Sequence, residues 1–228
     1  HQRNEGANGK ILQYLSQTFL YPASFDSLLY ASQLLQAEAI RYGVEHWRRN
    51  RGRCMGAVYW QLNDIWPVAS WASIDYYGRW KALHYYAKRF FAPVMISCEE
   101  IGETTDRIAV VTQPSPIEMS GRIAVANETR EDIKGIVRWQ LRDAEAKILL
   151  EGTQEMLIPA LSSRWMEKVY FPGADYLANY LSYSFETEKG VVSSGTVLFT
   201  APKHFRFRDP HLTWERQGNR LIVSGNAY

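Results

Sequence analysis

Residues 56–93 read GAVYWQLNDIWPVASWASIDYYGRWKALHYYAKRFFAP. This stretch is the most diagnostic part of the chain because its residue pattern changes twice along its length. An apolar run over residues 54–62 is bounded by Gly52 and Asn63-Asp64, and it predicts a strand that is buried on both faces. A loop rich in Trp, Pro and Ser follows, and a helical pattern closes the stretch. Helix, buried strand, loop and helix form the repeat unit of an α/β barrel or a doubly wound sheet.

Aromatic residues are dense in the same stretch, and amide and carboxylate side chains stand beside them. The apolar face of a sugar ring stacks on an indole, and its hydroxyls need fixed hydrogen-bond donors and acceptors. The alternative is that these rings form ordinary core, which is the usual fate of a single Tyr or Phe. The high density of aromatic rings that carry an N–H or O–H group favours a sugar-binding site. The stretch holds four of the eight tryptophans, namely Trp60, Trp66, Trp71 and Trp80.

Three residues near the predicted strand end are the candidate binding residues. Trp60 stands two residues before that end, where a barrel would point it toward its mouth, and Asn63 and Asp64 follow directly. Glycosidases use two carboxylates, and Asp64 and Asp75 both fall in this loop. Capping or loop scaffolding is the competing interpretation for Asp64, and it is favoured further for Asp75. No catalytic residue is assigned from the pattern.

The segments that precede this stretch predict helices. Residues 10–20 form a short helical candidate, and a long helix is expected from about residue 25 to residue 50. Ser24 is a suitable N-cap, and apolar residues recur behind it at three- and four-residue spacing. Basic residues gather in the last turn, as the helix macrodipole favours, and Gly52 is a stop signal.

Beyond residue 93 the pattern becomes that of short strands. Turn signals separate many of the apolar alternating runs, and the number and spacing of the strands predict a β-sandwich of immunoglobulin type. Its tryptophans Trp139, Trp165 and Trp214 are expected in the core. Residues 203–228 predict two or three further strands that open another β-domain. The strands are expected at 94–99, 106–112, 121–127, 135–142, 147–151, 153–158, 163–171, 178–187 and 190–200.

Composition excludes several classes of protein. The net charge is +2, and the Arg run at residues 48–53 is explained by the helix end, so no nucleic-acid partner is expected. No run of 18 apolar residues occurs, so no membrane partner is expected. Cys54 and Cys98 are too few for a disulfide scaffold and lack zinc-ligand spacing, and each is expected to behave as a small buried hydrophobe. No cofactor motif is present.

Several motifs resemble the β-mannosidases of glycoside hydrolase family 2. They are residues 1–4 (HQRN), the helix motif 32–38 (SQLLQAE), the strand motif 59–64 (YWQLND) with Trp66-Pro67, and residues 70–85 (SWASIDYYGRWKALHY). The match is dense over residues 1–93 and specific to the mannosidase branch, since the related β-galactosidases and β-glucuronidases have a different strand motif.

The resemblance implies an α/β part followed by all-β parts. Residues 1–93 would be the C-terminal part of a (β/α)₈ catalytic barrel, comprising its last strand and the helices beside it. Residues 94–200 would be the immunoglobulin-like β-sandwich that follows the barrel, and residues 201–228 the truncated start of a C-terminal β-sandwich. The chain would then be a piece of a longer protein, as the absence of Met at its start and the strand pattern at its end also suggest.

The resemblance also implies a function for that longer protein, the retaining hydrolysis of non-reducing terminal β-mannose without a metal or cofactor. The acid/base and nucleophile glutamates would precede His1, so the chain alone is expected to be inactive. Trp60 would line the terminal mannose subsite, Asn63 and Asp64 would shape it, and Arg79 and Trp80 would fix the loop and the closing helix.

Two alternatives remain open at this point. The sandwich could be a non-catalytic carbohydrate-binding or scaffold module, or it could brace the barrel or form a homodimer interface. On the barrel interpretation, residues 1–92 expose surface meant for other barrel strands. They are therefore expected to pack against the sandwich, to self-associate, or to be partly disordered.

Overall fold

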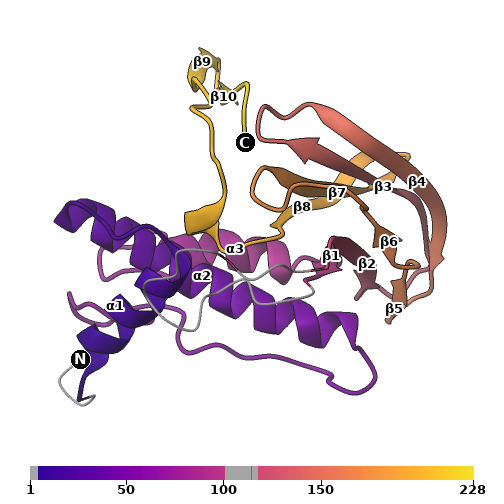
Figure 1. Cartoon of the computed structure of the whole chain (residues 1–228). Coiled ribbons are helices and arrows are strands. Elements are labelled where there is room, and N and C mark those ends of the chain that lie inside the picture. The colour runs from indigo at the N-terminus through magenta and orange to yellow at the C-terminus, as the bar shows by residue number, and fades with distance from the viewer. Residues whose placement is uncertain (1–4, 101–113, 115–117) are drawn as a thin grey trace.

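The computed structural model describes residues 5–100, 114 and 118–228, and three helices occupy the N-terminal part. They are α1 (Ala7–Thr18), α2 (Phe25–Arg49) and α3 (Ala82–Phe90) (Figure 1). The predicted N-cap of α2 is confirmed, because the Ser24 side chain accepts a hydrogen bond from the Ser27 amide. The last turn of α2 carries the expected basic residues.

The strand predicted over residues 54–62 is wrong. The segment is irregular, and its Val58 is 95% exposed rather than buried. A strand needs a neighbour for its N–H and C=O groups, and in the described part of the chain this region has only isolated bridges, which join Asn63 to Ile74 and Ile74 to Trp80. No strand that the structure describes lies beside this segment.

The closing helix also begins later than expected. The sequence predicts its start near Gly78, but α3 starts at Ala82. Gly78 instead sits in a tight turn with φ of 79°, a left-handed conformation that suits glycine. Its amide donates to the Asp75 carbonyl at 3.0 Å.

The immunoglobulin-like β-sandwich is confirmed. Both of its sheets are antiparallel. One is built from β1 (Val94–Glu99), β2 (Ser120–Asn127), β5 (Ser162–Trp165) and β6 (Val169–Tyr170). The other has the order β4 (Ile148–Ile158), β3 (Ile133–Asp143), β7 (Asn179–Thr187) and β8 (Gly190–Leu198).

Three of the expected strands differ in detail. The strands expected at 147–151 and 153–158 are one continuous strand, β4, which pairs along its whole length with β3. The strand expected at 163–171 is divided into β5 and β6. The strand expected at 106–112 lies outside the described residues.

The sandwich core lies between the two sheets. Fully buried side chains such as Ile123, Val137 and Phe185 meet there, and Cys98 is buried among them as a free thiol, as expected. Cys54 is only half-buried. Packing leaves no room at Gly135, where an added Cβ would lie 2.5 Å from the Glu186 carbonyl oxygen.

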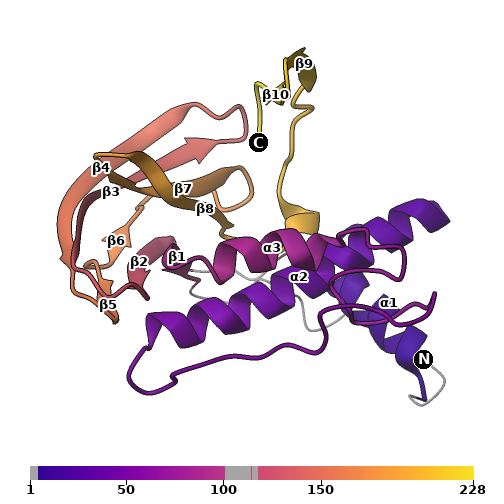
Figure 2. The ribbon, with the colours of Figure 1, turned by 180° about the vertical axis from the view of Figure 1, so that it is seen from behind.

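The helices pack on the β1–β2–β5 sheet, as Figures 1 and 2 both show. Apolar side chains of α2 and α3 join Met95 and Ala126 in a second core cluster. The Arg49 guanidinium donates to the Cys98 carbonyl at 3.2 Å, and the Ser163 hydroxyl donates to the Arg48 carbonyl at 2.7 Å. Of the three outcomes expected for residues 1–92, packing against the sandwich is thus observed for α2 and α3.

The last segment forms a hairpin of β9 (Thr213–Gln217) and β10 (Arg220–Ser224) that stands away from the sandwich (Figures 1 and 2). Every residue of its two strands is exposed. The expectation that Trp214 is core is therefore wrong: its side chain is 72% exposed, because no second sheet covers the hairpin among the described residues.

The Asn127 side chain links the end of β2 to two loops through hydrogen bonds. It is fully buried, donates to the carbonyls of Glu131, Ile158 and Pro159, and accepts from Thr129. We expect Asn127→Ala to lower the free energy of unfolding by about 1–3 kcal/mol, since the abandoned backbone groups stay buried. Urea denaturation measures this, with the exposed Glu131→Ala as control. A loss below 0.5 kcal/mol, on the scale of a surface change, would contradict it.

Candidate functional site

The candidate site is the loop that joins α2 to α3. Helix α2 holds it from one side: the Gln36 side chain donates to the Trp71 carbonyl at 2.9 Å, and the Gln33 side chain accepts from the Ala82 amide at 3.2 Å. Within the loop, residues 61–64 run beside residues 73 and 74, and three backbone hydrogen bonds of 2.8–3.0 Å join them. The loop therefore has a defined path despite its lack of strands.

A small polar cluster fixes the interior of this loop. The Ser73 hydroxyl donates to the Leu62 carbonyl at 2.9 Å, and it also contacts the Tyr59 hydroxyl at 2.9 Å and the His84 Nδ1 atom at 3.1 Å. The His84 ring in turn packs edge-on against Trp80, with 4.3 Å between centroids. His84 is thus a packed histidine, as the sequence favours.

The indole rings of the loop lie open to solvent. Trp60 is 72% exposed, and the other tryptophans of the loop are about half exposed. Asn63 is exposed three residues further on, and its amide nitrogen contacts the Asp64 carbonyl at 3.2 Å. The sequence-predicted pair Trp60 and Asn63 is therefore exposed in the part of the chain that the structure describes.

Asp64 is placed differently. Its side chain is buried, and its carboxylate accepts from the Ser70 hydroxyl and from the Lys81 ammonium, the latter at 3.2 Å. These contacts tie together both ends of the segment 64–81. They match the scaffolding role that the sequence left open for Asp64, so this residue shapes the loop that presents its neighbour Asn63.

Asp75 likewise forms hydrogen bonds within its own turn. Its carboxylate accepts from the backbone amides of Tyr77 and Arg79, and from the Arg79 guanidinium at 2.6 Å. Desolvation would raise the pKa of Asp75, but the hydrogen bonds from Arg79 outweigh it and hold that pKa below its usual value. Neither Asp64 nor Asp75 is left as an unengaged acid, because each carboxylate accepts hydrogen bonds from groups of this loop.

Lys81 and Ser70 are the positions of the candidate site that sequence reasoning missed, since both contact the Asp64 carboxylate. Lys81 looks like an ordinary surface charge in the sequence, yet its side chain is largely buried against Asp64. The two residues are 17 positions apart, and no helical or strand spacing links them, so nothing in the sequence signals the pair.

The part of the chain that the structure describes holds no group of three or more His, Cys, Asp or Glu side chains suited to a metal ion. None of its helices combines the length and apolar character needed to cross a membrane.

Comparison with known proteins finds β-mannosidases both in sequence and in structure. The sequence profile of the Mannosidase Ig/CBM-like domain matches residues 121–204. β-Mannosidase of Capra hircus is 45% identical over 101 residues, which are 39% of this chain and 12% of the goat protein. Part of the chain is thus similar in sequence to β-mannosidases.

A fungal relative extends the match. β-Mannosidase B of Aspergillus terreus is 31% identical over 140 residues, which cover 60% of this chain and 16% of the fungal protein. The chain thus matches less than a fifth of the length of these β-mannosidases.

The fold itself has a counterpart among solved structures. The crystal structure of the β-D-mannosidase from Dictyoglomus thermophilum superposes with a TM-score of 0.84 over 98% of this chain and 26% of that protein. The sequences are 22% identical in this superposition. The helices, the loop and the sandwich of this chain therefore occur together in a known fold.

Proposed function

We propose that this chain is part of a retaining β-mannosidase of glycoside hydrolase family 2 that hydrolyses non-reducing terminal β-D-mannose residues. Its contribution is the wall of the sugar pocket: Trp60 stacks on the terminal mannose, Asn63 binds a hydroxyl, and Asp64 shapes the loop. The observation that carries this proposal is the open Trp60 ring beside an exposed amide, in a loop that buried hydrogen bonds hold in place.

The domain organisation follows from the same proposal. Residues 1–93 complete a (β/α)₈ barrel, residues 94–200 form the immunoglobulin-like sandwich, and residues 201–228 begin a further β-domain. The exposed apolar side chains around Trp60, which include Met55, Val58 and Leu62, support the barrel assignment. Neighbouring barrel strands would cover them and supply the hydrogen-bond partners that residues 54–62 lack.

The chemistry then requires two glutamates on barrel strands that precede His1. One protonates the leaving oxygen and later activates water, and the other forms the covalent glycosyl-enzyme. Asp64 and Asp75 are both hydrogen-bonded within their own loop, which supports placing the two catalytic acids elsewhere in the enzyme. Stacking on Trp60 would hold the sugar in the position that both acids require.

Turnover of an aryl β-mannoside by the isolated 228-residue chain tests this division directly. We expect release of the aryl alcohol at the rate of the uncatalysed reaction, because the stacking wall alone supplies neither proton nor nucleophile. Hydrolysis above that rate, abolished by replacing Asp64 or Asp75 with the corresponding amide, would place the acids in this loop and contradict the proposal.

A further inference from the structure

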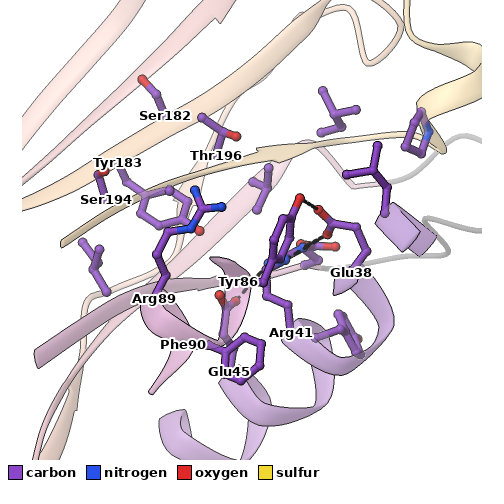
Figure 3. Close-up of a pocket in the computed structure, with 18 of the residues that line it drawn as sticks. Glu38, Arg41, Glu45, Tyr86, Arg89, Phe90, Ser182, Tyr183, Ser194 and Thr196 are labelled. Carbon is purple, nitrogen blue, oxygen red and sulfur yellow. Dashed lines mark hydrogen bonds and ion pairs between the residues drawn. The ribbon is translucent and has the colours of Figure 1, made fainter. Parts of the chain in front are cut away.

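A large cavity lies between the helices and the β7–β8 edge of the second sheet (Figure 3). Its volume is about 1230 Å³, more than the 300–1,000 Å³ that is typical of small-molecule sites. Helices α2 and α3 form one wall, and strands β7 and β8 form the other. The candidate residues Trp60, Asn63 and Asp64 do not line it, so it is separate from the site described above.

Two hydroxyls of largely buried residues line this cavity. Tyr183 is 4% exposed and Thr200 is 3% exposed, and neither hydroxyl has a hydrogen bond to any residue that the structure describes. Neither oxygen is among the fully buried unpartnered side-chain atoms of the described residues, so both can be reached from the cavity. A polar ligand in the cavity could therefore form hydrogen bonds to both hydroxyls.

The Tyr183 hydroxyl is held at the cavity wall. Tyr183 on β7 stands directly opposite Gly195 on β8, and its ring lies across that glycine. A Cβ at position 195 would lie 2.6 Å from the hydroxyl oxygen, so only glycine allows this placement. The side chain is therefore pre-positioned for a ligand rather than free to turn elsewhere.

The charges of the helical wall are largely satisfied among themselves. Arg41 forms ion pairs of 2.8–2.9 Å with Glu38, Glu45 and Glu100. Desolvation alone would lower the pKa of Arg41, but attraction by these carboxylates outweighs it and raises that pKa. The three carboxylates disfavour an anionic ligand, and the Arg41 and Arg89 guanidinium groups disfavour a cationic one.

Further groups on both walls suit a neutral polyhydroxylated ligand. Arg89 lies 4.9 Å from the centre of the Tyr86 ring and has no carboxylate partner among the described residues, so its donors are available. Ser194 is exposed on the opposite wall, and the partly exposed ring of Tyr42 also lines the cavity. Donors, acceptors and an aromatic face in one cavity are what a sugar needs.

We propose that this cavity is a second carbohydrate-binding site, which takes a neutral oligosaccharide through the hydroxyls of Tyr183 and Thr200, the Arg89 guanidinium and the Tyr42 ring. The site lies at the junction of the helices and the sandwich and requires residues from both. It does not depend on the proposed hydrolase activity.

Isothermal titration of the 228-residue chain with mannotriose and with cellotriose tests this site. The titrations use a Trp60→Ala background, so that the aromatic loop contributes nothing to the binding. We expect one of these sugars to bind, and Tyr183→Phe and Thr200→Val each to weaken binding about fivefold, as the loss of one neutral hydrogen bond does. Ser194→Trp, a change at an exposed position, should fill the cavity and abolish binding.

The matched control is Lys88→Ala, which removes an exposed cation beside Arg89 that does not line the cavity and should leave the affinity unchanged. Circular dichroism confirms that each variant is folded. The proposal is overturned if neither sugar binds, or if binding survives both Ser194→Trp and the two hydroxyl deletions. Such a failure would leave the aryl mannoside result untouched, because that test concerns the Trp60 loop alone.

Discussion

Replacing Arg41 with alanine is expected to lower the free energy of unfolding by about 3–5 kcal/mol. The Arg41 guanidinium joins Glu38 and Glu45 of its own helix to Glu100, which follows the first sandwich strand. The side chains of Glu45 and Glu100 are both 10% exposed. Without Arg41, Glu45 keeps only the Arg49 guanidinium at 3.6 Å, and Glu100 keeps no ion pair among the described residues, so the helix–sandwich junction loses an ionic contact.

Chemical denaturation of the variant and the parent chain measures this effect. Lys88→Ala on α3 is the matched control, since Lys88 is exposed and its loss should change stability by less than about 0.5 kcal/mol. Adding Glu45→Gln to Arg41→Ala should recover part of the loss, because it removes one of the abandoned charges. A change below 1 kcal/mol for Arg41→Ala would show that the network does not hold the junction together.

The sandwich and the long helix could be predicted from the sequence because their signals are local. The Ser24 cap, the apolar spacing of α2 and the alternation along β3 and β7 are each visible within a dozen residues. The chain itself contains the neighbouring strands of the sandwich. The expected strands therefore have partners for their backbone hydrogen bonds. The division into helices before residue 93 and strands after it follows from these signals.

The strand expected over residues 54–62 failed for a related reason. Its apolar run has the composition of a buried strand, but a strand exists only through hydrogen bonds to neighbours. In the described part of the chain no strand lies beside Val58 or Trp60. Composition therefore predicts correctly that this segment is apolar. Its conformation depends on neighbouring strands that the local sequence does not specify.

The candidate site was accessible to sequence reasoning only in part. The accessible Trp60 and Asn63 could be proposed from residue type and from their place at the end of an apolar run. The partners of Asp64 could not, because the distance along the chain to Lys81 matches no regular spacing. The contact between Arg41 and Glu100 is hidden for the same reason, since 59 residues separate the two.

The effect of Trp60→Ala on hydrolysis is the second large expected change. In the longer enzyme that the proposed function requires, we expect kcat/KM for an aryl β-mannoside to fall about 10- to 100-fold. Burial of an aromatic ring against the sugar contributes about 1.5–3 kcal/mol, and this contribution is lost with the indole. The open position of Trp60 makes an unfolding effect of this substitution small by comparison.

The measurement that tests this account most directly compares Trp60→Ala with Trp214→Ala in that longer enzyme. Both indoles are 72% exposed in this chain, so the two substitutions remove the same ring from equally open positions. The account predicts that Trp60→Ala reduces kcat/KM at least tenfold while Trp214→Ala leaves it within about twofold of the parent enzyme. Equal values for the two variants would contradict the claim that Trp60 forms a wall of the mannose pocket.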